Sequence, residues 1–298
     1  MKKLIRLFMV LVFALFAFAA CEENDSKGTL TLSITDAPID MTNVTGVYIK
    51  VNEIQINKSG SDWVTFEGFV GPQTFNILEL TNGESVMMGS IEFEAGQYNQ
   101  IRFILDAPEM GGGLNPSNPG CYITFSDGPD QPLFVPSGGE SGWKAVGSFK
   151  VPENGDVAIT ADFDARKSVM KQGANDFYIL KPTIRLIVDG QAGKIVGGVT
   201  NIPEGVDIII YAYEAGVYTA DEAVDPINDT TARFPNAITS DKVDDTDSYC
   251  LAFLAPKTYD LVVTSSIDGV FQEVLGIVED VAVESRKTTN QPIDISSL

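Results

Sequence analysis

The sequence predicts an all-β protein in which two β-sandwich domains follow a lipoprotein signal peptide. Beyond residue 27, short runs rich in Val, Ile, Thr, Phe and Tyr alternate with Gly, Pro, Asn and Asp, the pattern of strands joined by turns. Residues 29–35 (TLTLSIT) alternate strictly between polar and apolar, as a half-buried strand does. Helical periodicity is nearly absent. Helical turns are expected only at 36–41, where Asp36 is a candidate cap, and at 165–171.

The N-terminal residues carry the features of a lipoprotein signal. Basic residues precede an unbroken apolar run at 7–20, which is too short to span a bilayer core of ~30 Å comfortably. The run ends in small residues before Cys21, an arrangement that resembles a bacterial lipobox. We therefore predict that residues 1–20 are removed and that Cys21 is lipidated. The alternative is an ordinary signal peptide followed by a chance cysteine.

Residues 21–27 form an acidic tether between this cysteine and the first expected strand. Each buried methylene contributes ~0.8 kcal/mol, so several acyl chains on one cysteine would hold the protein to a membrane without a transmembrane helix. The tether resembles the acidic export signal that sends lipoproteins of the Bacteroidetes type to the outer face of the outer membrane. The alternative is a plain flexible linker. We expect a lipid-anchored protein of the cell envelope, exposed on the outer membrane.

Strand patterns divide the rest of the chain into two predicted domains, at 28–188 and 193–298. The segment between them has the composition of a linker. Within the first domain the apolar face switches between 47–51 and 54–56, which indicates a bulge or a strand that passes between sheets. Both halves carry an excess of acidic residues. We therefore expect them to repel each other and to sit like beads on a string.

Composition excludes several kinds of chemistry. The chain has 298 residues, with 41 acidic against 20 basic side chains and a formal net charge of −21, which argues against nucleic acid as a partner. It contains no histidine, which excludes Ser-His-Asp and Cys-His catalysis and every histidine-ligated metal site. Its three cysteines cannot make a four-thiolate metal site. We expect no cofactor.

Several separated motifs occur together in the first predicted domain. They are LSITDAP at 32–38, VTGVYI at 44–49, GQYNQIRFILD at 96–106, VPSG at 135–138, DFDARKSV at 162–169 and YILKPTIRL at 178–186. In this order they resemble the family called domain of unknown function 4382 (DUF4382), found on secreted bacterial lipoproteins, over roughly 28–188. The glycine- and proline-rich insert at 109–120 departs from it, because the family implies a shorter hairpin there. The resemblance implies a location and an architecture, but no activity.

The second predicted domain resembles the carboxypeptidase-regulatory-like or transthyretin-like modules of many surface proteins. The resemblance is carried by GKIVGGV at 193–199 and by the run at 249–263. We expect that run to form a hairpin with its turn at 255–258, although Lys257 stands where such modules usually have glycine. The resemblance implies Ig-like or prealbumin-like β-sandwiches with a structural or binding role.

Asp162 and Asp164 are the candidate catalytic pair. Two residues apart on a predicted strand, they point to the same face with Cβ atoms ~6.6 Å apart, within the ~6.5–9.5 Å that inverting glycosidases place between carboxyl groups. Alternation puts both opposite Phe163 and the expected core, however, and Arg166 and Lys167 follow and favour ionised carboxylates. We therefore prefer turn capping and local ion pairs over a catalytic role.

Two further groups are candidate binding sites. Asp244, Asp245 and Asp247 offer oxygen ligands for calcium, but the run lacks the order of a recognised calcium loop, and we prefer a solvated acidic turn. Trp63 and Trp143 lie beside glycine and serine loops and are candidates for a platform on which a glycan stacks. The alternative is that each tryptophan closes one end of a sandwich core.

Cys121 and Cys250 remain after lipidation of Cys21 and fall in different predicted domains. A disulfide would clamp the two domains together and needs Cα atoms within ~7 Å. The apolar alternation around Cys250 favours a buried thiol there. We expect two free thiols.

Together these features predict a non-enzymatic, lipid-anchored binding or adhesion module of the cell surface. Its partners would be the membrane, through the anchor, and a surface glycan or protein, contacted by loops or edge strands. The second hypothesis is an accessory carbohydrate-binding lipoprotein of a polysaccharide-utilisation system. The third is a glycoside hydrolase that uses Asp162 and Asp164.

Overall fold

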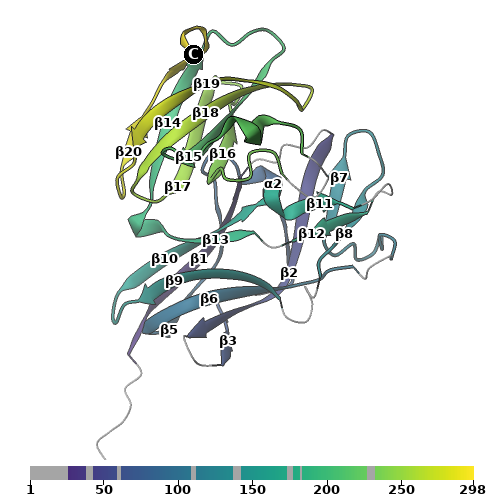
Figure 1. Cartoon of the computed structure of the whole chain (residues 1–298). Coiled ribbons are helices and arrows are strands. Elements are labelled where there is room, and N and C mark those ends of the chain that lie inside the picture. The colour runs from purple at the N-terminus through teal and green to yellow at the C-terminus, as the bar shows by residue number, and fades with distance from the viewer. Residues whose placement is uncertain are drawn as a thin grey trace, which may run out of the picture.

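The computed structural model describes most of the chain beyond residue 25 as an all-β protein, which confirms the predicted fold class (Figure 1). The described residues are 26–37, 43–58, 62–108, 112–136, 142–172, 177–181, 183–226 and 232–298. The predicted signal peptide at 1–20 and Cys21 lie outside them. Within these ranges no helix has the length and apolar character needed to cross a membrane.

One sheet of 13 strands occupies the N-terminal part of the fold, and we call it the N-terminal sheet. Its strands are β1 (Lys27–Ala37), β2 (Val44–Lys58), β3 (Trp63–Thr65), β4 (Gln73–Asn76), β5 (Val86–Glu94), β6 (Gly96–Leu105), β7 (Tyr122–Phe125), β8 (Gln131–Phe134), β9 (Trp143–Val151), β10 (Asp156–Asp164), β11 (Val169–Lys171), β12 (Tyr178–Leu180) and β13 (Ile184–Val188). Short helical turns are η1 (Ile77–Glu79), α2 (Ala165–Ser168) and η2 (Asp189–Gln191).

The strand order of this sheet is β11-β12-β8-β7-β2-β6-β9-β13-β10-β1-β5, with β3 and β4 both paired to β2. Strands along the whole path contribute to one hydrophobic core, so the sheet curves around its own interior. The first strand, β1, runs parallel to the late strand β10, with Thr29 opposite Asp156. On its other edge β1 pairs with β5, and this register places Lys27 opposite Glu94.

Strand β2 connects two parts of the N-terminal sheet. Its first half pairs with β4 and β7, and its second half pairs with β3 and β6. The register with β6 shifts between Val51 and Glu53, and the buried side chains change there from odd to even positions. The predicted change of face is confirmed. It arises from a bulge and from a change of partner strands.

The C-terminal part is a sandwich of two four-stranded sheets, which we call the C-terminal sandwich. Its strands are β14 (Gly193–Thr200), β15 (Asp207–Glu214), β16 (Thr239–Lys242), β17 (Ser248–Leu254), β18 (Thr258–Ile267), β19 (Val270–Ala282), β20 (Thr288–Asn290) and β21 (Ile293–Asp294), with the turns η3 (Ala220–Ala223) and η4 (Ile295–Ser297). One sheet holds β17, β14, β20 and β21, and the other has the order β16-β15-β18-β19. Their inner faces form a common core.

The prediction of a hairpin at 249–263 is wrong. Strand β17 pairs with β14, whereas β18 pairs with β15 and β19, so the two consecutive strands lie in opposite sheets. Inward side chains such as Leu251 and Leu261 meet in the same core, across the sandwich rather than side by side. Alternation identifies the buried face of each strand. It does not show whether two consecutive strands are neighbours in one sheet or face each other from opposite sheets, because both arrangements give the same alternation.

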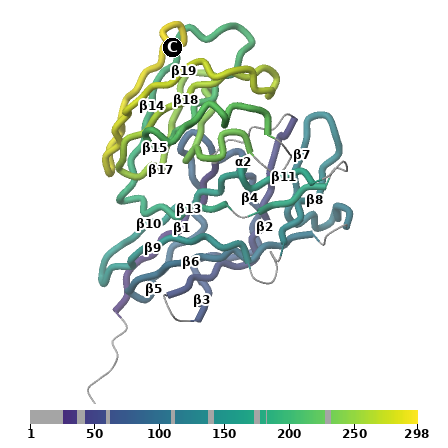
Figure 2. The backbone as a smooth tube through the Cα atoms, in the orientation of Figure 1, coloured from purple at the N-terminus to yellow at the C-terminus, as the bar shows by residue number. Residues whose placement is uncertain are grey.

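The beads-on-a-string arrangement is also wrong, because the two parts pack against each other. The connection between β13 and β14 is short (Figure 2), and the C-terminal sandwich holds it through a hydrogen bond from Arg286 Nε to the Gly190 carbonyl at 2.8 Å. In Figure 1, α2 lies on the side of the N-terminal sheet that faces the sandwich. From α2, Lys167 Nζ donates to the Ala237 carbonyl at 2.7 Å, and the Arg166 guanidinium lies 5.4 Å from the Tyr211 ring centroid.

Local charge explains why two acidic parts pack together. The contact places basic side chains of α2 against carbonyl oxygen and an aromatic ring, both of which attract cations. Most of the acidic side chains that give the chain its net charge lie elsewhere on the surface. At physiological ionic strength, salt largely screens their repulsion at separations beyond about 8 Å. The net charge of each part was therefore a poor guide to this contact.

Candidate functional site

The candidate catalytic carboxylates lie at the junction between the two parts. Asp162 and Asp164 are on β10 and are 4% and 6% exposed, so the face opposite Phe163, where the sequence placed them, is buried as well. The residues next to Asp162 in a narrow buried space include Thr239 and Ser240 of the C-terminal sandwich. The end of β10 is buried on both faces for this reason: one face covers the core of the N-terminal sheet and the other faces the junction.

Each carboxylate is engaged by basic side chains, as the preferred interpretation of turn capping and ion pairs predicted. Asp164 Oδ2 lies 2.9 Å from Arg166 Nη2, and the Asp164 side chain also accepts from the Lys167 backbone as the cap of α2. Although burial opposes ionisation, the charges of Arg166 and Lys167 hold the pKa of Asp164 below its ordinary value. A general acid requires the opposite shift. Asp162 Oδ2 accepts from Arg185 Nη2 at 2.5 Å, across to β13.

Asp36 has a role that the sequence pattern missed. We expected it to cap a local turn at 36–41, of which 38–41 lie outside the described residues. Within the described residues its Oδ1 accepts a hydrogen bond from the Ala165 amide at 2.9 Å. Because β1 and β10 run parallel and in register to their last residues, the end of β1 lies beside the first residue of α2. A sequence pattern contains no signal for a cap supplied from so far along the chain.

A second buried carboxylate joins the two parts of the fold. Asp241 on β16 is 1% exposed. It accepts from the Cys250 amide at 2.7 Å and from the Asn82 amide of the N-terminal part at 3.4 Å. With the Asn82 carboxamide turned so that its nitrogen faces Asp241, the orientation that hydrogen bonding requires there, this nitrogen donates to both carboxylate oxygens at 3.2 and 2.7 Å. Burial raises the pKa of Asp241 to about 7, against these hydrogen bonds.

The turn that carries Asn82 is shaped for this contact. Asn82 and Gly83 both have positive φ, 57° and 76°, which glycine adopts readily and asparagine tolerates. A Cβ at Gly83 would lie 3.0 Å from the Cys250 Sγ and 3.0 Å from the Ala252 Cβ. Glycine therefore lets the turn approach β17 closely.

The acidic run with the calcium candidates forms a closed turn. A single oxygen of Asp244, Oδ1, accepts from the Thr246 amide, the Thr246 hydroxyl and the Ser248 amide at 2.7–3.0 Å. These hydrogen bonds lower the pKa of Asp244. Asp247 takes a positive φ of 57°, and neither it nor Asp245 joins a metal-binding group. In the described part of the chain, no three acidic or cysteine side chains gather in a way that could hold a metal.

The two tryptophans occupy different environments. Trp143 is 1% exposed, and its ring meets Phe163 edge-on with centroids 4.5 Å apart, so it is a core residue and the expectation of a glycan platform is wrong for it. Trp63 is half-buried on β3. The Arg102 guanidinium lies over the Trp63 ring, 4.2 Å from the centroid. One face of that ring is therefore already occupied, which leaves Trp63 a weak platform.

The two described cysteines are free thiols, as expected. Cys121 is buried, and burial raises the pKa of its thiol to about 12. Cys250 is half-buried rather than buried, next to the turn at Gly83. Neither has the low pKa of a reactive thiolate, because burial raises both.

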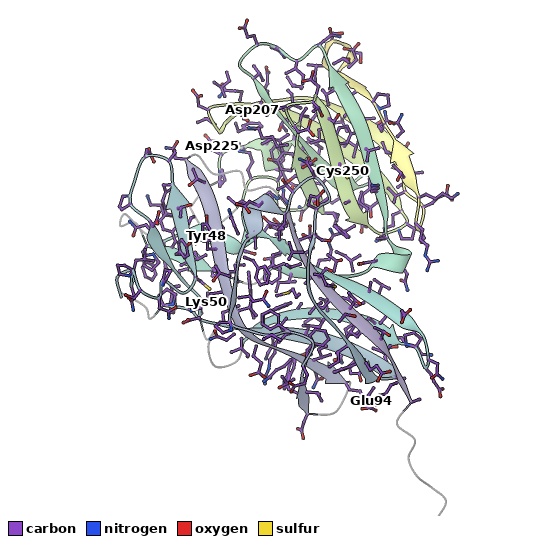
Figure 3. All side chains as sticks on the ribbon, turned by 180° about the vertical axis from the view of Figure 1, so that it is seen from behind. Tyr48, Lys50, Glu94, Asp207, Asp225 and Cys250 are labelled. Atoms are coloured by element: carbon purple, nitrogen blue, oxygen red, sulfur yellow. The ribbon has the colours of Figure 1, made fainter. Side chains whose placement is uncertain are left out.

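An open groove lies at the end of the N-terminal sheet formed by β7, β8 and β12. Its volume is about 380 Å³, and it is lined by Asn43, Phe125, Asp127, Gly128, Pro129, Gln131 and Tyr178. We call this space the β7–β8 groove. A volume of this size falls in the range of small-molecule sites. Tyr48 on β2, labelled in Figure 3, stacks on Tyr122 of the neighbouring β7 with ring centroids 4.4 Å apart.

The walls of the β7–β8 groove combine aromatic rings with polar side chains. Phe125 and Tyr178 lie with ring centroids 5.3 Å apart. Asn43 Nδ2 donates to Asp127 Oδ2 at 2.8 Å, which ties the start of β2 to the β7–β8 turn and fixes both polar groups at the rim. Such a lining offers carboxamide and carboxylate oxygens beside an apolar ring, so it can hydrogen-bond and stack at once. The sequence motifs did not indicate this groove, because Asn43 and Tyr178 join the turn at 125–131 from distant parts of the chain.

The fold and the site define a class of protein. It is an all-β protein whose buried carboxylates stabilise the fold and whose open groove presents aromatic and amide groups. The model of the family described as "Domain of unknown function (DUF4382)" matches residues 27–182, and the chain belongs to this family. None of the curated proteins matches the chain.

Several solved structures are distantly similar to the chain. GBS52, a minor pilin of Streptococcus agalactiae, is 12% identical, with 89% of this chain and 94% of that one covered and a TM-score of 0.23. The shaft pilin SpaA of Lactobacillus rhamnosus GG is 10% identical, with coverage of 90% and 98% and a TM-score of 0.21. A fimbrial protein of Bacteroides ovatus is 12% identical, with coverage of 91% and 49% and a TM-score of 0.21. Scores this low do not establish a shared fold and carry no conclusion about function.

Proposed function

We propose that this protein is a lipid-anchored lipoprotein of the cell envelope, exposed at the cell surface, that acts as a non-enzymatic binding or adhesion module. The observation that carries the binding role is the contrast between two sites. The paired carboxylates at the junction are buried and engaged by arginine, whereas the β7–β8 groove is open and lined by groups suited to recognition.

The path of the chain supports presentation away from a membrane. Only five residues separate Cys21 from Lys27, the first residue of β1. Lys27 lies opposite Glu94 in the register of β1 with β5. Figure 3 shows Glu94 at the end of the N-terminal sheet that lies away from Asp207 and Cys250 of the C-terminal sandwich. An anchor at Cys21 would thus sit at one end of the molecule, and the C-terminal sandwich would stand farthest from the membrane.

The anchor is tested by labelling cells with a palmitate analogue. We expect label on the native protein and none on Cys21→Ser, with Cys121→Ser as the matched control that keeps its label. Protease treatment of intact cells tests the exposed position. A native protein that carries no label, or one that is cut only after the outer membrane is broken, would contradict the proposal.

The lining of the groove favours one more specific function, an accessory carbohydrate-binding lipoprotein of a polysaccharide-utilisation system. Sugars present hydroxyl groups to carboxamide and carboxylate oxygens and a C–H face to aromatic rings, and the β7–β8 groove offers both through Gln131, Asp127 and Phe125. Amphipathic rings of this kind contribute packing and a polar contact together.

A glycan array with the native protein and three variants tests this function. We expect the native protein to bind a polysaccharide and Gln131→Ala and Asp127→Ala to lose most of that binding. Asp130→Ala is the control, because Asp130 lies in the same turn and does not line the groove. If all three variants bind as the native protein does, the groove is not the binding site.

A further inference from the structure

The basic residues of the C-terminal sandwich are engaged unequally. Residues 190–298 contain 18 acidic and 6 basic side chains. Four of the six basic side chains form ion pairs: Arg233 with Asp225, Lys242 with Asp207, Lys257 with Glu214 and Lys287 with Glu284. Within the described residues Lys194 and Arg286 form none. In a region with three carboxylates for every cation, two cations without a carboxylate partner need an explanation.

Both of these cations line the same cleft. It has a volume of about 290 Å³ and is lined by Gly83, Asp189, Ala192, Gly193, Lys194, Ala252, Phe253, Arg286, Lys287 and Thr288. We call it the junction cleft, because Gly83 belongs to the N-terminal part and the remaining residues to the connection and the C-terminal sandwich. Three of the six basic side chains of residues 190–298 therefore meet around one small space.

The exposed guanidinium of Arg286 is oriented by a hydrogen bond to the connection beside this cleft. Its Nε donates to the Gly190 carbonyl at 2.8 Å, and its Nη2 lies so close that a Cβ on Gly190 would be 2.9 Å away. The Arg286 backbone amide donates to the Ala192 carbonyl at 2.7 Å. Within the described residues the other N–H groups of this guanidinium have no hydrogen-bond partner, so they are suited to a planar or tetrahedral oxyanion, which arginine binds in a bidentate manner.

The carboxylates near the cleft do not cancel this charge. Glu284 neutralises Lys287, which leaves Lys194 and Arg286. Asp189 also lines the cleft, and although burial raises its pKa, we count its carboxylate as one negative charge against the two cations. The net charge of the whole chain acts from farther away and is screened beyond about 8 Å at physiological salt. The local field in the cleft is therefore positive.

We propose that the junction cleft binds the anionic group of an acidic sugar, with Arg286 and Lys194 holding the oxyanion and Phe253 and Ala252 forming an apolar wall beside the ring. The volume lies at the lower end of the range of small-molecule sites, which suits one sugar unit. This inference goes beyond the proposed function and is independent of both the anchor and the β7–β8 groove.

The test is calorimetric titration of the detergent-purified full-length protein with four probes: glucuronate, glucose 6-sulfate, glucose 6-phosphate and glucose. We expect at least one anionic probe to bind and glucose to bind at least about tenfold more weakly, because charge-assisted hydrogen bonds are the strongest available here. The three anions distinguish a carboxylate from a sulfate or phosphate group as the natural ligand.

Variants locate the site. Lys194→Gln and Arg286→Gln should each weaken the anion about tenfold or more. Lys194 is exposed and makes no ion pair in the described chain, so its variant keeps the test valid if the loss of the Arg286 hydrogen bond disturbs the fold. Lys242→Gln removes an equally exposed cation outside the cleft and should bind as the native protein does. Failure of every anion to bind, or an equal loss in Lys242→Gln, would overturn the proposal.

Discussion

The backbone amide of Asn82 donates to Oδ1 of Asp241 across the junction, with 3.4 Å between nitrogen and oxygen. Asp241 is buried, and its other oxygen accepts from the Cys250 amide of its own sandwich. A single carboxylate therefore binds backbone from both parts of the molecule. A similar arrangement recurs at α2, where Lys167 reaches the Ala237 carbonyl. The two parts are joined through buried polar groups whose partners cannot be exchanged freely for water.

The raised pKa of Asp241 predicts a pH dependence of stability. Burial raises its pKa from 3.8 to about 7, so between these values the folded protein binds a proton that the unfolded chain releases. Stability should therefore fall as the pH rises from about 4 to about 7. Urea unfolding at pH 5 and pH 7.5, in the native protein and in Asp241→Asn, measures this contribution. We expect a smaller fall in the variant. Parallel curves for the two proteins would contradict the assignment.

Removing the carboxylate of Asp164 should destabilise the protein strongly. Asp164→Ala leaves the Arg166 guanidinium, whose side chain is 2% exposed, without its ion-pair partner. Breaking a buried pair from one side costs roughly 3–5 kcal/mol. The matched control is Glu94→Ala, which breaks the exposed pair with Lys58 and should cost about 1 kcal/mol or less. Denaturant unfolding compares the two, and equal losses would show that burial of the Asp164 pair is not decisive.

The two tryptophans should contribute unequally to stability. Trp143→Ala empties a fully buried position beside Phe163 and should cost roughly 3–5 kcal/mol. Trp63→Ala removes a half-buried ring and its contact with Arg102, which should cost about 1 kcal/mol. Thermal unfolding of both variants measures the difference. A larger loss for Trp63 would mean that β3 is more important to the fold than its burial indicates.

A hydrolase that used Asp162 would lose turnover in Asp162→Asn without a loss of stability. We expect the reverse. The native protein should release no reducing sugar from polysaccharides, and Asp162→Asn should lower the unfolding free energy because it weakens the contact with Arg185. Reducing-sugar release and urea unfolding are measured on the same samples. Turnover by the native protein that disappears in a fully stable variant would establish catalysis.

Local patterns predicted much of the fold. The alternation in β1 and the change of face in β2 correspond to the strand and to the bulge that the structure contains. The hairpin at 249–263 failed, because the partner of β17 is β14, some fifty residues earlier in the chain. A strand's own residues determine which face is buried, whereas its neighbours depend on which other strands compete for its edges.

The candidate site was predictable only where its causes are local. The ion pair of Asp164 with Arg166 lies within a few residues of chain and followed from the sequence. The burial of Asp162 did not follow from the sequence, because the group that covers it, around Thr239, comes from the other part of the fold. The β7–β8 groove adds Asn43 and Tyr178 to a turn far from both in sequence, and the junction cleft gathers residues from several distant segments. No spacing rule could have assembled either of them.

The parallel pairing of β1 with β10 means that β1 is synthesised long before its partner strand. The strand at 27–37 has a long-range partner at 156–164, so it emerges early and must wait for more than a hundred further residues. At a synthesis rate of ~5–20 residues per second, this wait lasts on the order of 10 s. During this interval one edge of β1 lacks its partner strand and can pair with other polypeptides. A chaperone that binds unfolded chains would protect the protein most at this stage.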